Sequence, residues 1–134
     1  MIRLPVVRDY MVTRLHTLTP EVNIFDAVDM LVERRISGAP VVHEGHVIGM
    51  LTEKDCVRLL TKGDHDDDVP TGTVGDYMVR DVKTVPPTMD IYYLAGLFLK
   101  YPFRRYPVVE DGVLIGQISR RDVLRAIQAH VPRT

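Results

Sequence analysis

Apolar positions in the first half of the chain change from a helical spacing to the pattern of a β-hairpin. Over residues 24–31 they lie three or four positions apart, which predicts an amphipathic helix with Asn23 as its N-cap. Two apolar runs follow, at residues 39–43 and 46–51, and only a Glu-Gly pair separates them. Apolar runs on both sides of a glycine turn predict two antiparallel strands.

A helix follows this hairpin, and the second half of the chain repeats the whole plan. Thr52 occupies an N-cap position before a helical stretch over residues 53–60, and Asp90 and Ser119 occupy cap positions further on. The elements expected in the second half are a helix over 90–101, strands over 106–109 and 113–118, and a helix after Ser119. Each half therefore predicts a short strand, a helix, two strands and a helix, so the expected fold class is mixed α/β (α+β).

The similarity of the two halves is an internal duplication with an offset of 67 residues. Without a gap, 16 of 54 positions are identical between residues 7–60 and 74–127. The longest identical stretches are Asp-Tyr-Met-Val at 9–12 and 76–79 and Pro-Val-Val at 40–42 and 107–109. Duplicated units often stack to bury faces that neither can bury alone. We assign residues 1–62 and 73–130 to two repeats, and residues 63–72 to an acidic linker.

Each repeat places a glycine, a hydroxyl and a carboxylate where its second strand meets the following helix. These residues are Gly49, Thr52 and Asp55 in the first repeat and Gly116, Ser119 and Asp122 in the second. A helix N-terminus favours an anion, and a carboxylate one turn further on can accept hydrogen bonds from a diol. The glycine would let a ligand approach the backbone closely. The same spacing is also that of a capping box, so a structural role stays open for each copy.

Taken together, these features resemble a pair of cystathionine-β-synthase (CBS) domains over about residues 5–128. The matching features are the Asp-Tyr-Met-Val openings, the Thr-Leu-Thr-Pro and Thr-Val-Pro-Pro segments, the Pro-Val-Val strands and the Gly-x-x-Thr/Ser-x-x-Asp endings. The resemblance implies two βαββα repeats that pair through their sheets about a pseudo-twofold axis. It also implies two clefts, which in this family commonly hold AMP, ADP, ATP, S-adenosylmethionine or a relative.

The resemblance further implies which residues would contact the ligand. Asp55 and Asp122 would bind ribose hydroxyls, and Thr52 and Ser119 would bind ribose or phosphate. The other implied contacts are Thr17 and Thr84 near ribose and phosphate, and Gly38, Ala39, Arg105 and Tyr106 at the base or phosphate, with Tyr106 bordering an adenine.

The two implied sites differ in charge. The second repeat has Arg104 and Arg105 where the first has Ser37 and Gly38, and Arg120 and Arg121 where the first has Glu53 and Lys54. Arginine side chains suit phosphate oxygens because they offer several donors in a planar fork. This asymmetry favours a phosphorylated ligand and tighter binding in one cleft. The structural alternative is that these arginines are simply solvated.

Composition excludes several other classes of protein. Seventeen basic and eighteen acidic residues give a formal charge of −1, which argues against a generic nucleic-acid binder. The single cysteine, Cys56, excludes an intrachain disulfide and a multi-cysteine zinc site. The carboxylates at 64–68 lack the spacing of a calcium loop, so we expect no metal site there. No apolar run is long enough for a membrane span or a secretory signal, and we expect a cytoplasmic protein.

We therefore expect a regulatory module that binds an adenosine-containing ligand, needs no cofactor and passes a conformational change to an effector protein. The sequence shows no nucleophile, base and acid set, so we do not expect an enzyme. One alternative is a structural dimerisation module whose clefts stay empty. Another is an enzyme that acts on a nucleotide in the cleft, which would need a water-activating group.

Apolar residues on the outer helices also predict a homodimer. They are Val57 and Leu60 in the first repeat, and Leu94, Leu97, Phe98, Val123, Leu124 and Ile127 in the second. Exposed apolar stripes tend to be interfaces, and twofold dimers are the commonest arrangement. The resemblance implies the same, since two CBS pairs often meet through helices as a disc.

Overall fold

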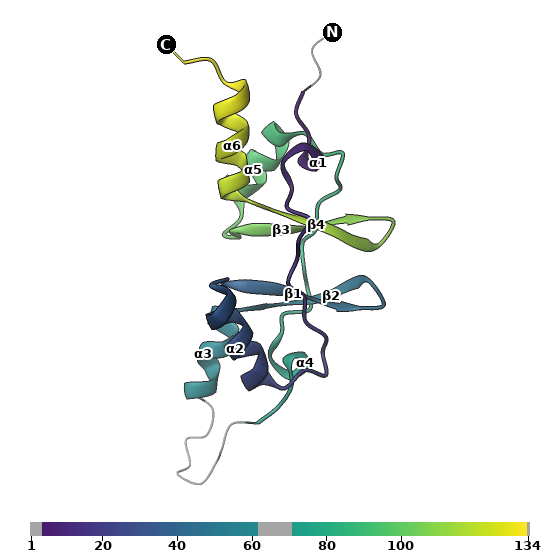
Figure 1. Cartoon of the computed structure of the whole chain (residues 1–134), viewed down its shortest axis with the longest axis vertical. Coiled ribbons are helices and arrows are strands. Elements are labelled where there is room, and N and C mark those ends of the chain that lie inside the picture. The colour runs from purple at the N-terminus through teal and green to yellow at the C-terminus, as the bar shows by residue number, and fades with distance from the viewer. Residues whose placement is uncertain (1–3, 62–70, 134) are drawn as a thin grey trace. The chain divides into compact units, whose positions relative to one another are not determined.

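Two β-hairpins, each covered by helices, form the centres of two compact units (Figure 1). The computed structural model describes residues 4–61 and 71–133. Unit 1 consists of residues 1–15 together with 83–134, and unit 2 is continuous over 16–82. The mixed α and β fold expected from the sequence is confirmed. Most of the acidic linker, including the carboxylates at 64–68, lies outside the described residues.

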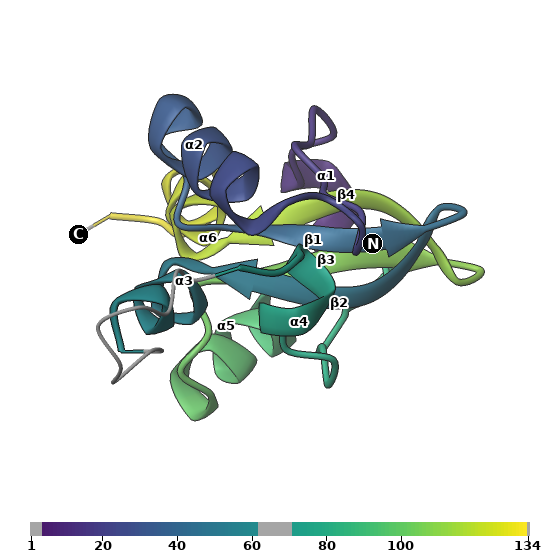
Figure 2. The ribbon, with the colours of Figure 1, turned by 90° about the horizontal axis from the view of Figure 1, so that it is seen from below.

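Unit 2 contains the helices and strands expected from the first repeat and one short helix from the second. Its elements are α2 (Ile24–Arg34), β1 (Gly38–His43), β2 (His46–Thr52), α3 (Glu53–Val57), the 3-10 helix η1 (Arg58–Leu60) and α4 (Val74–Tyr77). β1 and β2 pair antiparallel, and φ is 51° at Glu44 and 83° at Gly45, as a tight hairpin turn requires. Asn23 caps α2, because its side chain accepts a hydrogen bond from the Phe25 N–H at 2.9 Å. Figure 2 shows α2 and α3 at the end of the hairpin away from its turn.

Unit 1 repeats this construction with the second half of the chain. Its elements are α1 (Val7–Tyr10), α5 (Ile91–Lys100), β3 (Arg105–Glu110), β4 (Val113–Ser119) and α6 (Arg120–His130). β3 and β4 pair antiparallel around a turn with φ of 52° at Asp111 and 81° at Gly112. Asp90 caps α5 by accepting from the Tyr93 N–H at 2.7 Å. The local patterns therefore predicted both hairpins and their flanking helices, except that the helix expected over 53–60 is α-helical only to Val57 and continues as the 3-10 helix η1.

The compact units do not coincide with the repeats of the sequence, because each hairpin pairs with the opening segment of the other repeat. We call residues 6–12 and 73–79 the entry segments. Val12 exchanges two backbone hydrogen bonds with Gln117 of β4, at 2.8 and 2.9 Å. Val79 does the same with Met50 of β2, at 2.9 Å in both directions. Each unit thus combines the hairpin of one repeat with the entry segment of the other.

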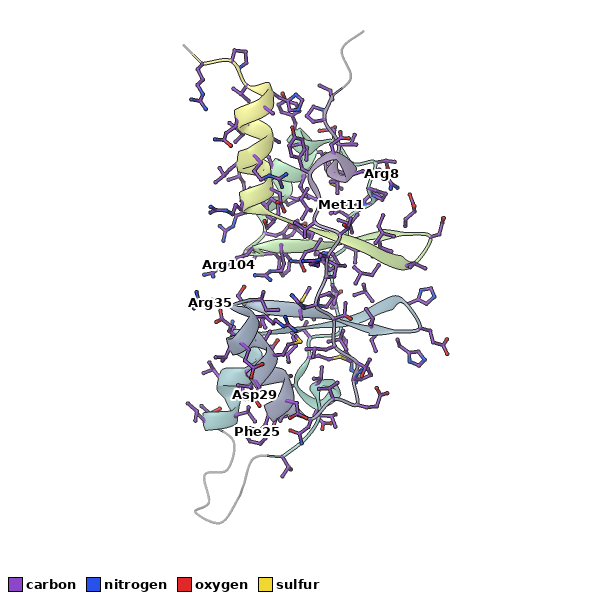
Figure 3. The ribbon with its side chains drawn as sticks, in the orientation of Figure 1. Arg8, Met11, Phe25, Asp29, Arg35 and Arg104 are labelled. Carbon is purple, nitrogen blue, oxygen red and sulfur yellow. The ribbon has the colours of Figure 1, made fainter. Side chains whose placement is uncertain are left out.

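Close packing of the entry segments explains the glycines of the two repeated motifs. A Cβ at Gly116 would lie 2.7 Å from Sδ of Met11, which Figure 3 labels, and 3.1 Å from the Val12 carbonyl oxygen. A Cβ at Gly49 would lie 2.5 Å from Sδ of Met78. The expectation that these glycines clear space for a ligand is therefore wrong. They clear space for the methionine of an Asp-Tyr-Met-Val segment.

Each unit has its own hydrophobic core between its helices and its hairpin. The core of unit 2 comprises Leu18, Ile24, Ala27, Leu31, Ala39, Val41, Leu51, Leu59, Val74, Tyr77 and Met78. The core of unit 1 comprises Val7, Val85, Ile91, Leu94, Phe98, Tyr106, Val108, Ile118, Val123 and Ala126. Leu94, Phe98 and Val123 were expected on an outer apolar stripe, and that expectation is wrong because their side chains fill this second core. Val57, Leu60, Leu124 and Ile127 are exposed, as the stripe required.

Candidate functional site

The two predicted clusters lie at the starts of α3 and α6 and share one hydrogen-bond pattern. In unit 2, the N–H and the hydroxyl of Thr52 donate to Oδ2 of Asp55, at 2.9 and 3.0 Å. In unit 1, the N–H and the hydroxyl of Ser119 donate to Oδ2 of Asp122, at 2.8 and 3.0 Å. One carboxylate oxygen in each unit therefore caps the N-terminus of its helix, and the capping role that the sequence left open is confirmed.

The second carboxylate oxygen, Oδ1, faces an arginine one turn further along each helix. Nη1 of Arg125 donates to Oδ1 of Asp122 at 3.0 Å, whereas Nη1 of Arg58 lies 3.8 Å from Oδ1 of Asp55. Both arginine side chains are 55% exposed, so water or a ligand can reach them. The Asp55 and Asp122 side chains themselves are only 3% and 8% exposed, so a ligand hydroxyl would have to displace the arginine to reach Oδ1. Sequence reasoning did not include these arginines among the site residues, although they are identical at the offset of 67.

Burial separates these two aspartates from others with the same spacing. Thr73 and Asp76 form a third hydroxyl–carboxylate cap, at 2.9 and 3.3 Å, and the Val6 N–H donates to Asp9 at 2.9 Å. Asp9 and Asp76 are exposed, whereas Asp55 is 2% and Asp122 is 5% exposed. A buried carboxylate must be paired or hydrogen-bonded, and each of these two has a helix cap on one oxygen and an arginine beside the other. The spacing alone predicts a cap, and burial marks the two candidate sites.

The strand starts lie directly beside these helix starts in each unit. The Arg120 N–H donates to the Arg104 carbonyl oxygen at 3.2 Å, and Arg105 pairs with Ser119 across the two strands. In unit 2, the corresponding bond runs from the Glu53 N–H to the Ser37 carbonyl oxygen at 2.9 Å. The structure thus brings together the residues before the strand prolines and the hydroxyl–carboxylate motifs.

The surroundings of the two helix starts differ sharply in charge. Arg104, Arg120 and Arg121 are exposed in unit 1, and Arg105 is half-buried (Figure 3 labels Arg104). In unit 2, Gly38 is buried and packs so tightly that a Cβ there would lie 3.0 Å from the Leu51 carbonyl oxygen. Ala39 beside it is fully buried. The start of α6 is therefore the one suited to a phosphate, because four arginines lie at or beside a helix N-terminus.

The two threonines of the candidate set lie beside the starts of β1 and β3. Thr17 precedes Leu18, whose N–H donates to the Pro40 carbonyl oxygen at 3.0 Å. Thr84 precedes Val85, which donates in the same way to Pro107 at 3.0 Å. Both threonine side chains are exposed. Each threonine therefore lies beside the strand that begins at the candidate site of its own unit.

The Tyr106 ring lies in the core of unit 1. Its side chain is 1% exposed, its hydroxyl donates to the Leu97 carbonyl oxygen at 3.3 Å, and its ring packs against Phe98 and Phe103. Burial raises the pKa of this phenol above its ordinary value. The Phe103 ring makes a T-shaped contact with the Tyr106 ring and is 38% exposed. Phe103 therefore exposes aromatic surface to solvent, whereas Tyr106 does not.

Cys56 lies half-buried near the start of α3 and lines an apolar hollow with Val28, Leu31, Val32 and Glu53. Burial raises the pKa of its thiol, and the carboxylates of Asp55 and Glu53 raise it further. A raised pKa keeps the thiol protonated near neutral pH, which makes it a weak nucleophile. This environment fits a packing role for Cys56.

Arg125 connects the unit 1 site to the N-terminal entry segment. Besides Asp122, its Nη1 donates to the Tyr10 carbonyl oxygen at 3.4 Å, and its guanidinium lies 5.7 Å from the centre of the Tyr10 ring. The Tyr10 hydroxyl is 2.7 Å from Nε2 of His130 at the end of α6. A change at Asp122 can therefore reach α1 through a single side chain.

Residues 4–61 and 71–133 include no helix that is long and apolar enough to cross a membrane. Within the same ranges, no group of three or more His, Cys, Asp or Glu side chains is arranged so that it could hold a metal ion.

Comparison with known families agrees with the duplicated architecture. The CBS domain model matches the chain twice, over residues 7–62 and 74–129. A curated relative, the uncharacterized protein MJ1225 of Methanocaldococcus jannaschii, is 32% identical over 123 residues, which cover 90% of this chain and 42% of that protein. A second, the CBS domain-containing protein YhcV of Bacillus subtilis, is 27% identical over 117 residues, which cover 87% of this chain and 81% of YhcV. The chain spans less than half the length of the first curated relatives it matches.

Solved structures share the fold over nearly the whole chain. The crystal structure of CBSX2 in complex with AMP has a TM-score of 0.81 and 32% identity, and it covers 93% of this chain and 97% of that one. CBSX2 comes from Arabidopsis thaliana. The CBS domain pair of MJ0100, in complex with 5-methylthioadenosine and S-adenosyl-L-methionine, has a TM-score of 0.79 and 23% identity over 95% of this chain and 98% of that one, and shows the shared fold alone.

Proposed function

The chain belongs to the CBS domain family and carries two copies of the domain, and on that basis we propose that it is a regulatory module for an adenine nucleotide. The observation that carries the proposal is the pair of buried aspartates, each with one oxygen in a helix cap and the other beside an exposed arginine. The AMP complex of CBSX2, which is 32% identical, supports a nucleotide as the ligand class.

The proposed contacts follow from which partner a ligand could replace and from where the arginines lie. A ribose hydroxyl donates to Oδ1 of Asp122 and displaces Arg125 from it. Phosphate oxygens lie at the start of α6, where Arg104, Arg120 and Arg121 supply charge and donors. Unit 2 offers Asp55 to a ribose in the same way but has Glu53 and Lys54 in place of the arginine pair. The proposal therefore assigns the tighter phosphate-bearing ligand to unit 1.

Arg125 also supplies a route from ligand to response. When a ribose takes Oδ1 of Asp122, Arg125 loses its 3.0 Å partner and its hold on the Tyr10 carbonyl changes. The N-terminal entry segment then reports ligand occupancy to an effector protein. This role is regulatory, and the proposal assigns no catalytic step to any residue. With a single cysteine, the chain suits the reducing cytoplasm, where we place it.

Calorimetry with AMP tests the site through a matched pair of variants. Asp122→Asn keeps an oxygen for the helix cap and removes the charge that would accept the ribose hydroxyl. We expect AMP affinity to fall about 10- to 100-fold, the range for one hydrogen bond to a charged group. Asp76→Asn makes the same change in an exposed cap outside the site and should leave binding unchanged. Equal AMP affinity in Asp122→Asn and the unaltered protein would refute the site.

A structural module without a ligand is the second candidate, and one observation favours it. In both aspartates one carboxylate oxygen accepts the hydrogen bonds of a helix cap and the other lies beside an arginine, so both carboxylates have partners without a bound ligand. Thermal unfolding with AMP, ADP, ATP, S-adenosylmethionine and NAD separates the two functions. A ligand that binds only the folded protein raises the melting temperature with concentration. No shift with any of the five would favour the structural module.

We further propose that two copies of the chain form a homodimer through exposed apolar residues of their helices. Val57, Leu60, Leu124 and Ile127 are between 46% and 90% exposed, an unusual amount of apolar surface for short helices. Light scattering at micromolar concentration should report about twice the chain mass of 15.2 kDa. A mass near 15.2 kDa would refute the dimer.

A further inference from the structure

The two units carry opposite charge, although the whole chain is nearly neutral. Unit 1 holds eleven Lys and Arg against five Asp and Glu, a formal charge of +6. Unit 2 holds six Lys and Arg against thirteen Asp and Glu, a formal charge of −7. Without residues 62–70, unit 2 still has a formal charge of −4. The overall charge of −1 therefore conceals one basic and one acidic unit.

Exposed apolar residues occur at the same four positions of both repeats. In unit 2 they are Phe25, Val32, Val57 and Leu60, and 67 residues later in unit 1 they are Tyr92, Leu99, Leu124 and Ile127. We call the first set, on α2, α3 and η1, the acidic face, and the second set, on α5 and α6, the basic face. Val32 and Leu60 are 71% and 90% exposed, and Leu99 is 90% exposed, so these side chains are not part of either core.

Two charged positions are reversed in sign between the two faces, whereas Lys54 and Arg58 correspond to residues of unchanged sign, Arg121 and Arg125. Glu33 of α2 corresponds to Lys100 of α5, and Glu53 of α3 corresponds to Arg120 of α6. Glu53 lines one hollow with Val32, so this carboxylate lies beside the apolar residues of the acidic face. On α2, Asp29 and Phe25 lie one turn apart (Figure 3). The apolar positions are thus alike in the two faces, whereas two of the charged positions beside them and the net charges of the two units are opposite in sign.

We infer that the partner of the acidic face is the basic face of a second copy, so that the homodimer is head-to-tail. Apolar residues at equivalent positions of the two repeats then contact one another. Glu33 and Glu53 of one copy face Lys100 and Arg120 of the other. A head-to-head dimer would place each of these carboxylates against the same carboxylate of the second chain, and like charges at an interface are unfavourable. Charge complementarity therefore selects one of two otherwise equivalent pairings.

This inference rests on the proposed homodimer, and disulfide trapping separates the failure of one from the failure of the other. In a Cys56→Ala background, Leu60→Cys and Ile127→Cys are prepared separately and mixed before mild oxidation. The head-to-tail dimer gives a linked pair containing one chain of each kind, and no linked pair from either variant alone. Linked pairs from Leu60→Cys alone would overturn the orientation but keep the dimer. A monomer by light scattering would overturn both. Val113→Cys, 41% exposed at the start of β4 and outside the helices that form the faces, is the control for random collision.

Charge reversal supplies a second readout that does not depend on cysteine geometry. Glu33→Lys should raise the dimer Kd about three- to tenfold, because a head-to-tail dimer contains two copies of the affected pair, each a partly exposed charge pair. Adding Lys100→Glu to the same chain should return the Kd to its original value, since the pair is restored with its signs exchanged. A head-to-head dimer would show neither the loss nor the rescue, and that result would overturn the inference.

Discussion

Gly116 offers a direct measurement of how tightly an entry segment is held. Its φ lies outside the left-handed region, so alanine can adopt its backbone conformation, and the effect of Gly116→Ala is decided by packing. The added methyl would lie 2.7 Å from Sδ of Met11 and 3.1 Å from the Val12 carbonyl oxygen. The methionine can swing away. The carbonyl cannot, because the Gln117 N–H holds it at 2.9 Å.

Two opposing terms set the size of the expected effect. Replacing glycine by alanine restricts the unfolded chain and stabilises by about 0.4–1 kcal/mol where the native conformation allows it. Overpacking a well-filled site costs about 1–3 kcal/mol. We expect the steric cost to prevail, with Gly116→Ala lowering the free energy of unfolding by about 1–2 kcal/mol.

Urea unfolding of four variants tests this explanation. The variants are Gly116→Ala, Met11→Ala, their combination, and Gly96→Ala as a control. The methyl group added at position 116 can occupy space vacated by the Met11 side chain, so the combined variant should be more stable than the sum of the single losses by about 1 kcal/mol. Gly96 lies within α5, and a Cβ there would meet no atom within 4 Å apart from its chain neighbours and the helix backbone, so Gly96→Ala should stabilise by about 0.5–1 kcal/mol.

Two outcomes would refute the reasoning. If Gly116→Ala were as stabilising as Gly96→Ala, Met11 and Val12 would not occupy the surface of β4 in solution. If the losses of Gly116→Ala and Met11→Ala were additive, their side chains would not share one space, and the glycine would need another explanation.

Two further predictions concern the environment of the candidate sites. In urea unfolding, Arg125→Met should lower the free energy of unfolding by about 1–3 kcal/mol, because it leaves Oδ1 of the buried Asp122 without its 3.0 Å partner. Arg58→Met should lower it less, because the distance from Arg58 to Asp55 is 3.8 Å. Equal losses in the two variants would contradict this explanation. The pKa of Cys56 is raised above its usual 9.0 by burial and then by Asp55 and Glu53, so Glu53→Gln should speed thiol labelling at pH values of about 8–9, and an unchanged rate would argue against the carboxylate. Since the folded state keeps this proton longer than the unfolded state, Cys56 should make the protein less stable as the pH rises above about 9, and Cys56→Ala should reduce that loss.

Local patterns in the sequence were sufficient for the hairpins, the helix caps and the duplication. Asn23, Asp90 and Ser119 accept hydrogen bonds from N–H groups two or three residues ahead, and the hairpin turns need only a positive φ at two adjacent residues. Interactions over such short separations depend on neighbouring residues alone, so they can be inferred from the chain. The candidate aspartates were found in the same way, because the motif that contains them occurs twice in one register.

Long-range pairing could not be inferred in this way. The two Asp-Tyr-Met-Val segments are identical in sequence, so the chain offers no local reason why residues 9–12 should pack on β4 and residues 76–79 on β2. The same holds for Tyr106, whose place in the core depends on Phe98 and Phe103, and for Arg125, which joins Asp122 to Tyr10 over more than a hundred residues. It holds for charge as well. Because each unit combines the hairpin of one repeat with the entry segment of the other, a chain with a formal charge of −1 is divided into one basic and one acidic unit, and that division is a property of the folded molecule.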